Sequence, residues 1–199
     1  MSSEPYNPVA ELARLREGAN ASGDPAADYG ILATLDPEGF PCMRGLTIRG
    51  FDPYGITFHV NAHSPKMTHL AANGRAEVLF FWPKALVQVR LRGDYTAGQD
   101  QSVVEAWRAK PSSSKAADLL HAELLPQSSV VASRTELLSQ YGQAVELLRS
   151  QSDPPASVVA LRFIPKFLEF WQCSPSDRMH ERFRCSLADN AWVKELLVP

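Results

Sequence analysis

Short apolar or alternating segments, separated by tight-turn sequences, begin at Tyr29 and constrain the fold more than any other feature. YGILATL is followed by DPEG, PCMRGLTIRG, FDPYG and GITFHVN. Runs of this length that are rich in β-branched and aromatic residues predict strands, and the Pro- and Gly-containing pieces between them predict turns. Because such short connections join antiparallel neighbours, residues 29–61 predict three consecutive antiparallel strands.

The rest of the chain interposes helices between further strands. The additional predicted strands are RAEVLFFW, ALVQVRLRGDYTAG, VVALRFI, FLEFWQC, HERFRCSL and WVKELLV. Helices are predicted around Val9–Leu15, over SPKMTHLAAN with Ser64 as the N-cap, over QSVVEAWRAK and over TELLSQYGQAVELL. A Ser- and Lys-bearing connection joins the last two helices, and SQSDPPAS reads as a loop. With no repeat or dividing linker, the pattern predicts one α+β domain over residues 1–199, built on a closed or nearly closed antiparallel sheet.

Composition and charge exclude several classes of protein. Hydrophobic residues make up 45% and charged residues 21%, which is typical of a soluble globular chain. The formal net charge of −2 argues against nucleic acid as a partner, and no apolar run approaches the ~20 residues that span a bilayer. The three cysteines show no C-x-x-C spacing, so neither a disulfide framework nor a metal site is expected. We therefore expect a cytoplasmic protein without a membrane partner.

Two cations lie where an anion would stabilise them. Arg44 shares a strand face with Leu46 and Ile48, and Lys66 lies in the first turn of the helix predicted to begin after Ser64. A cation in a core-facing row needs an anionic partner, and free N–H groups at a helix start also attract anions. The alternatives are a strand-end arginine that reaches solvent and a stray lysine in a capped helix.

The stretch EFWQCSPSDRMHERF, near the end of the chain, places Arg178, His180 and Arg182 at every second position. In an extended strand these three side chains would share one face, which predicts either a solvated face or an anionic ligand. His59, His63 and His69 have no spacing typical of metal ligands. The chain also lacks a glycine-rich phosphate loop, a G-x-S-x-G elbow and an H-E-x-x-H helix.

The order of these pieces resembles a known family. RGLTIR, FHVNAHSPK, FFWPKALVQVRLRG, PQSS, EFWQ, RMHERF and WVKELLVP follow one another in the order seen in the pyridoxamine 5'-phosphate oxidase family. The resemblance runs from about Asp24 to Pro199. It implies an antiparallel FMN-binding split β-barrel with flanking helices, a homodimer with flavins at its interface, and an oxidase that passes electrons to oxygen.

The same resemblance implies a role for individual residues. Arg44 and Lys66 match ligands of the flavin phosphate, and Gln88 matches a glutamine near the flavin ring. The remaining flavin positions are Gln127 and Ser128, together with Trp171 and Arg182 as contacts from the partner subunit. Arg178 and His180 match the pair that holds the vitamin substrate over the flavin. Those two are the expected catalytic residues.

The sequence departs from the family at the expected substrate-phosphate group. Lys, Tyr, Arg and Ser are usual there, and this chain has Arg49, Ala106, Lys110 and Ser114. Pro65 replaces an arginine before Lys66, and VVALR replaces a W-G-G-x-R sequence. The first hypothesis is an FMN-dependent oxidase that converts pyridoxamine or pyridoxine 5'-phosphate to pyridoxal 5'-phosphate. The alternatives are a flavin oxidase of another planar anionic substrate, of the carboxylated dihydro-phenazine type, and a non-catalytic flavin-binding protein.

Overall fold

The computed structural model describes residues 6–199, which divide into two compact units. The first unit contains the described residues up to Phe58, with Gly74–Tyr95 and Arg162–Pro199; the second contains His59–Asn73 and Thr96–Leu161. The chain passes between the units several times. The single domain expected over residues 1–199 stays a prediction, and its first five residues lie outside the described part.

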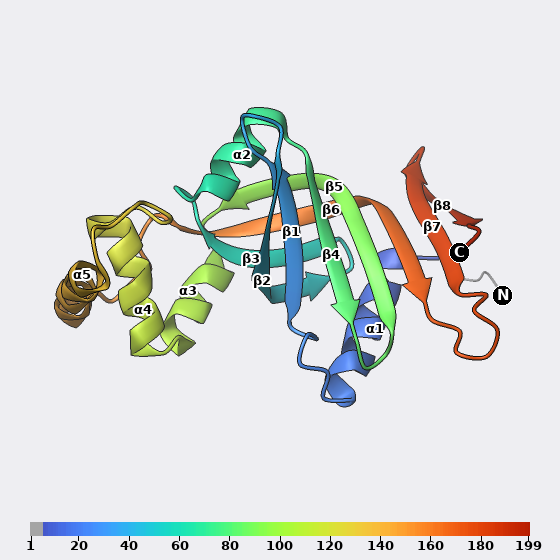
Figure 1. Ribbon diagram of the computed structural model, residues 1–199, viewed down its shortest axis with the longest axis horizontal. Helices are drawn as coiled ribbons and strands as arrows, with labels where there is room; N and C mark the ends of the chain where they lie inside the picture. The colour runs from blue at the N-terminus through green and yellow to red at the C-terminus, as the bar shows by residue number, and fades with distance from the viewer. Residues whose placement is uncertain (1–5) are drawn as a thin grey trace. The chain divides into compact units, whose positions relative to one another are not determined.

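Eight antiparallel strands form the sheet of the described chain (Figure 1). They are β1 (Tyr29–Leu35), β2 (Pro41–Asp52), β3 (Gly55–Asn61), β4 (Ala76–Trp82), β5 (Val87–Gly98), β6 (Val158–Gln172), β7 (Glu181–Ala188) and β8 (Ala191–Leu196). Their order is β3-β2-β1-β4-β5-β6-β7-β8, and an additional β3–β6 pairing closes the first six strands into a barrel. The predicted α+β class and the antiparallel split barrel are confirmed.

The barrel core lies in the first unit and follows the predicted period-two pattern. Val87, Val89 and Leu91 are at most 2% exposed, whereas Gln88, Arg90 and Arg92 on the opposite face of β5 are half-buried or exposed. Aromatic side chains fill the interior, with Phe80 stacked on Trp82 and Phe58 packed edge-on against Phe163. Each large apolar side chain buried in this way contributes roughly 1.5–3 kcal/mol.

Two glycines permit the barrel to close against β6. A Cβ added at Gly55 would lie 2.3 Å from the Phe163 carbonyl oxygen, and one at Gly93 would lie 2.0 Å from that of Ile164. Backbones that approach this closely leave no room for a side chain. The two glycines therefore determine where β3 and β5 can approach β6 closely enough to close the barrel.

We expect Gly93→Ala to destabilise the protein, because the added methyl group would meet backbone atoms that cannot rotate away. Overpacking of this kind costs about 1–3 kcal/mol, or roughly 2–4 °C in Tm for each kcal/mol in a chain of this length. Gly98→Ala is the matched control, since it lies on the same strand and an added Cβ there has nothing within 4 Å. Equal melting temperatures for the two variants would contradict this explanation of Gly93.

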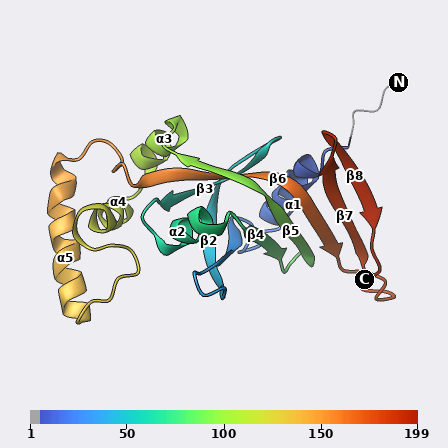
Figure 2. The same ribbon diagram turned by 90° about the horizontal axis from the view of Figure 1, so that it is seen from above.

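Helices belong to both units. They are α1 (Pro8–Ala21) in the first unit, and α2 (Pro65–Asn73), α3 (Gln101–Ala109), α4 (Ser112–Leu119), the π-helix η1 (Leu120–Leu124), α5 (Arg134–Leu147) and the 3₁₀ helix η2 (Leu148–Ser150) in the second. Asn7, Asp100 and Ser133 cap the starts of α1, α3 and α5 with their side chains. Figure 2 shows α4 beside α5, where a small core of Trp107, Leu119, Leu120 and Ala144 forms.

Two predictions about these elements are wrong. VVALRFI and FLEFWQC are one continuous strand, β6, because the φ angle of Pro165 suits extended backbone even though proline donates no hydrogen bond. The Ser- and Lys-bearing connection contains α4 and η1. Three successive serines resemble a loop, but Ala116, Leu119 and Leu120 have helical spacing and are buried. Within residues 6–199, no helix is long and apolar enough to cross a membrane.

Candidate functional site

A hollow of about 390 Å³ lies on the outward face of the first unit, over β4, β5, β6 and β7. Its walls are Phe81, Gln88, Arg90, Glu169, Trp171 and Arg182. Strand register explains why they meet, since Phe81 faces Gln88 across β4–β5 and Trp171 faces Arg182 across β6–β7. Three of the predicted flavin residues, Gln88, Trp171 and Arg182, are therefore brought together.

Alternating charges run across the same four strands. Glu77 accepts from the Nε atoms of Arg90 and Arg92, and Glu169 accepts from Arg90 and Arg182. Burial raises the pKa of Glu77, but the two arginines outweigh it and hold the pKa below its usual value. The hydrogen bond to Glu77 is the main reason that the pKa of Arg90 is raised. Figures 1 and 2 both show β5, β6 and β7 side by side, so the charges form one row.

The loop between β6 and β7 brings His180 to this region. The imidazole lies edge-on to Trp171, with 4.8 Å between ring centroids. Its Nδ1 accepts the backbone N–H of Ser174 at 3.1 Å. Asp177 orders the loop by accepting from the Ser174 hydroxyl at 2.6 Å and from the Met179 N–H at 2.9 Å.

The predicted alternation of Arg178, His180 and Arg182 along one strand is wrong. Strand β7 begins at Glu181, and Arg178 lies in the loop with a left-handed φ of 60°. A left-handed residue breaks the two-residue period, so the common face does not extend back to Arg178. Arg178 is exposed, whereas His180 and Arg182 are half-buried.

Arg44 lies elsewhere in the first unit, on β2. It is half-buried, and its Nη1 donates to the Leu32 carbonyl at 3.2 Å and to the Thr34 hydroxyl at 2.7 Å. Burial lowers the pKa of its guanidinium, and within residues 6–199 no carboxylate forms an ion pair with it. The side chain has neutral partners on one nitrogen, an arrangement that accommodates an anion on the others. Arg49, five residues along β2, is exposed.

In the second unit, Lys66 is buried at 8% exposure in the first turn of α2. The predicted N-cap Ser64 precedes the helix, and its hydroxyl accepts from the Lys66 ammonium at 2.6 Å.

Gln127 and Ser128 lie in the turn after η1, where Ser128 has a left-handed φ of 70°. The side-chain oxygen of Gln127 is buried without a hydrogen-bond partner among the described residues. A buried acceptor without a donor fits a ligand that brings an N–H group.

The predicted substrate cation Lys110 has a carboxylate partner that sequence reasoning missed. Its ammonium forms an ion pair with Asp118 of α4, and both side chains are about three-quarters buried, at 25% and 22% exposure. Ser114 lies one helical turn before Asp118 on the same face. Helical periodicity over SSSKAADLL would have placed Asp118 beside Ser114. Glu169 was also missed, although it opens the EFWQ motif and alternates with the apolar residues of β6.

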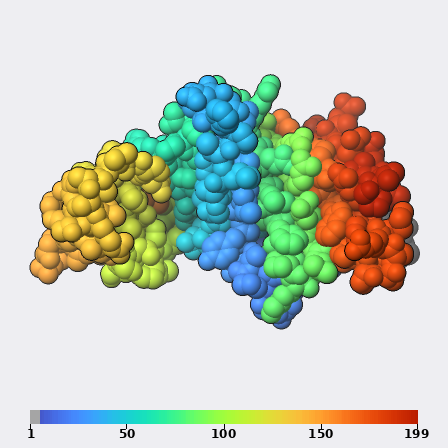
Figure 3. Space-filling view, in the orientation of Figure 1, coloured from blue at the N-terminus to red at the C-terminus, as the bar shows by residue number. Residues whose placement is uncertain are grey.

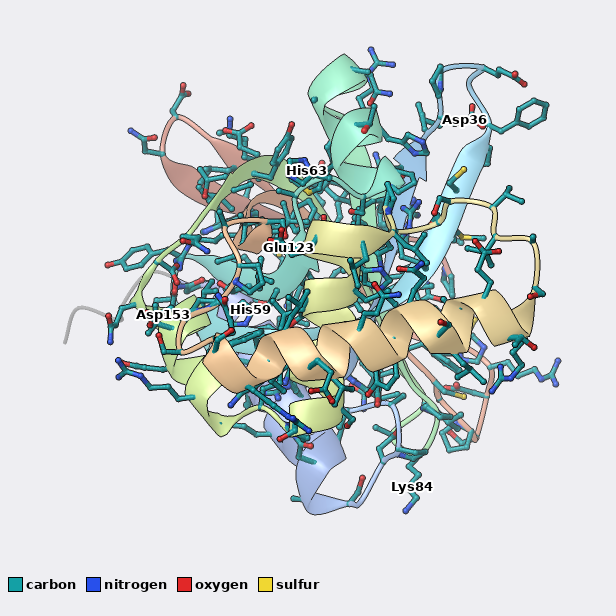
Figure 4. The ribbon with its side chains drawn as sticks, turned by 90° about the vertical axis from the view of Figure 1, so that its left-hand side faces the viewer. Asp36, His59, His63, Lys84, Glu123 and Asp153 are labelled. Atoms are coloured by element: carbon teal, nitrogen blue, oxygen red, sulfur yellow. The ribbon has the colours of Figure 1, made fainter. Side chains whose placement is uncertain are left out.

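Figure 4 shows His59 and His63 well apart in the second unit. His59 Nε2 lies 3.2 Å from the Ser102 hydroxyl, so its neighbour is a polar side chain of α3. Over the described residues, no group of three or more His, Cys, Asp or Glu side chains could hold a metal ion.

Comparison with protein families matches most of the chain. Residues 25–138 match the model described as pyridoxamine 5'-phosphate oxidase, and residues 159–199 match the pyridoxine 5'-phosphate oxidase C-terminal dimerisation region. A pyridoxine/pyridoxamine 5'-phosphate oxidase of Pseudomonas paraeruginosa is 36% identical over 84% of this chain and 76% of its own length. The same-named protein of Pseudomonas fluorescens is 37% identical with the same coverage.

Solved structures show the same fold. PhzG from Burkholderia lata, in complex with tetrahydrophenazine-1-carboxylic acid, superposes with a TM-score of 0.87 at 24% identity and covers 99% of this chain and 95% of its own. A pyridoxamine 5'-phosphate oxidase-related, FMN binding protein from Nostoc punctiforme gives a TM-score of 0.73 at 21% identity, over 100% of both chains.

Proposed function

The chain belongs to the pyridoxamine 5'-phosphate oxidase family, and we propose that it oxidises pyridoxamine or pyridoxine 5'-phosphate to pyridoxal 5'-phosphate with oxygen as acceptor. It is an FMN-dependent oxidoreductase. The observation that carries the proposal is the hollow in the first unit, where Gln88, Trp171 and Arg182 meet and where His180 lies edge-on to Trp171.

The residues of the chain fit the flavin. We assign Arg44 and Lys66 to the flavin phosphate, since both are cations with much of their surface buried. The side-chain oxygen of Gln127, buried without a hydrogen-bond partner in the described chain, would accept from a flavin N–H. Gln88 and Ser128 would contact the same flavin, and Trp171 and Arg182 would contact it from the partner subunit of the proposed dimer. Bound FMN supplies the two-electron chemistry, because no side chain accepts a hydride.

His180 and Arg178 are the proposed substrate residues. Because Nδ1 of His180 accepts a backbone N–H, the neutral imidazole carries its proton on Nε2. The ring is therefore set to donate a hydrogen bond to the substrate and to orient it. Arg178 contributes charge from an exposed loop position, where it attracts an anionic ring.

We propose a homodimer in the cytosol. The C-terminal dimerisation region supports the dimer, and Val193, Leu196 and Val198 in that region expose 47%, 81% and 86% of their surface. Figure 3 shows β7 and β8, in orange to red, at the surface of the first unit. Cys42, Cys173 and Cys185 are free cysteines, which is compatible with the proposed location.

The ion pair between Lys110 and Asp118 favours a second candidate substrate. Lys110 is a proposed ligand of the substrate phosphate, together with Arg49 and Ser114, but Asp118 already neutralises it. The pair therefore offers an incoming anion little net charge, and this loss of attraction is larger for a phosphate dianion than for a carboxylate with a single charge. A carboxylated, planar, reduced aromatic substrate is therefore the alternative.

Removing the Asp118 charge tests which substrate fits. We expect Asp118→Asn to raise kcat/KM for pyridoxine 5'-phosphate by about tenfold, because Lys110 is released to a substrate phosphate. Turnover of tetrahydrophenazine-1-carboxylic acid should change much less. Asp153→Asn, in a loop of the same unit, is the control and should alter neither. An unchanged kcat/KM for the phosphate substrate in Asp118→Asn would count against Lys110 as its ligand.

A further inference from the structure

We propose that Glu169 is a positioning residue of the flavin site, acting through Arg182. The inference rests on the proposed role of Arg182 as a flavin contact. Glu169 is only 8% exposed, on the outward face of β6, where it lines the hollow. A carboxylate buried to this extent must be compensated by cations or hydrogen-bond donors.

One oxygen of Glu169 holds Arg182 along one edge of its guanidinium. Oε1 accepts from Nη2 at 3.0 Å and from Nε at 3.3 Å. The third nitrogen, Nη1, lies 3.5 Å from the Val198 carbonyl oxygen. These contacts fix the plane of a side chain that is otherwise long and flexible. Each terminal nitrogen keeps a second N–H, so the oriented guanidinium still has donors for a ligand.

Arg182 depends on Glu169 more than Arg90 does. The only contact of Arg90 with Glu169 is long, at 3.4 Å, and Arg90 is held separately by Glu77. Within residues 6–199, Glu169 is the one carboxylate that forms an ion pair with Arg182. Loss of Glu169 would therefore leave Arg90 anchored by Glu77, whereas Arg182 would keep the long, 3.5 Å contact with the Val198 carbonyl oxygen and could change conformation more easily.

The net charge of the residues in the row across β4 to β7 also supports a positioning role for Glu169. Three arginines (Arg90, Arg92 and Arg182) face two glutamates (Glu77 and Glu169), which leaves one net positive charge. Without the Glu169 carboxylate the net charge becomes two, and Arg90 and Arg182 repel each other across the hollow. Glu169 thus both aims Arg182 and allows it to remain beside Arg90.

A double-mutant cycle on FMN affinity tests the inference. We expect Glu169→Gln to raise the FMN Kd by about tenfold in the native background and by less than about twofold when Arg182 is already alanine. A residue that only stabilises the sheet would lower Tm and give additive effects on Kd. Glu169→Asp keeps the negative charge but moves the carboxylate away from Arg182, because its side chain is one methylene shorter. Its effect on the FMN Kd should therefore also be non-additive with Arg182→Ala, and it replaces Glu169→Gln in the cycle if the glutamine variant does not fold.

Glu195→Gln is the matched control. Glu195 pairs with Arg184 at 2.8 Å across β7 and β8, where both side chains are close to half exposed. Its replacement should leave the FMN Kd within about twofold of the native value. If Arg182→Ala weakens FMN and Glu169→Gln does not, or if the Glu169 effect persists without Arg182, the inference is overturned and the proposed function stands. If Arg182→Ala leaves FMN affinity unchanged, the flavin role of Arg182 fails and the inference fails with it.

Discussion

Replacing Arg44 or Lys66 by alanine is expected to weaken FMN binding by about one to two decades while riboflavin binding changes little. Each cation is assigned to the phosphate, and a charge-assisted contact contributes roughly 1.5–3 kcal/mol. Only FMN carries the phosphate, so the difference between the two flavins isolates that contact. Fluorescence titration of the apo-protein with each flavin measures both dissociation constants.

Two further measurements make the Arg44 result interpretable. Arg44→Ala also removes the donor to Thr34, which is buried, so the melting temperature of the apo-protein should be recorded beside the Kd. Arg14→Ala is the control for loss of a positive charge, because Arg14 pairs with Glu11 on the surface of α1. Equal losses of FMN and riboflavin affinity would remove the phosphate role from Arg44 and Lys66.

The second prediction distinguishes the residues that bind flavin from those that bind substrate. Arg182→Ala should release flavin, and its activity should partly return when excess FMN is supplied. Arg178→Ala and His180→Ala should retain flavin and lose turnover at saturating FMN. The loss should be milder for His180→Ala, since a neutral imidazole that donates one hydrogen bond contributes less than a cation does.

Glu181→Ala is the internal control for this set. Glu181 is exposed and is the first residue of β7, directly between His180 and Arg182. Its loss should change neither flavin content nor turnover. Absorbance of the purified variants at flavin wavelengths, followed by assays with added FMN, distinguishes the two groups. If Arg178→Ala loses flavin as readily as Arg182→Ala, the assignment of Arg178 to the substrate is wrong.

Most of the barrel could be predicted from the sequence because its signals are local. The alternation of apolar and polar residues in β5 shows which side chains face the core. The turn sequences at Asp36–Gly39 and Phe51–Gly55 show where consecutive strands are connected. The closing contacts against β6 were not predictable. From the sequence alone, Gly93 is a residue that destabilises a strand. Its role becomes clear only from the close approach of the Ile164 carbonyl, a contact between residues far apart in the chain.

The candidate site shows the same division. The family resemblance grouped Trp171 and Arg182 as flavin contacts, and the register of β6 and β7 places them opposite each other. Arg178 departs from the predicted alternation with His180 and Arg182 because it adopts a left-handed backbone conformation, and an arginine gives no sequence signal for that conformation. The partners of the cations, Asp118 for Lys110 and Glu169 for Arg182, depend on packing between elements. Ion pairs of this kind follow from the folded geometry and not from spacing along the chain.

Anaerobic mixing tests the central claim most directly. The FMN-loaded protein is mixed without oxygen with pyridoxamine 5'-phosphate, and separately with tetrahydrophenazine-1-carboxylic acid, while flavin absorbance is followed. An FMN-dependent oxidase of an anionic ring substrate predicts rapid bleaching with at least one of the two and return of the absorbance when oxygen is admitted. Flavin absorbance that stays unchanged with both substrates, in a protein that is folded and saturated with FMN, would contradict the account.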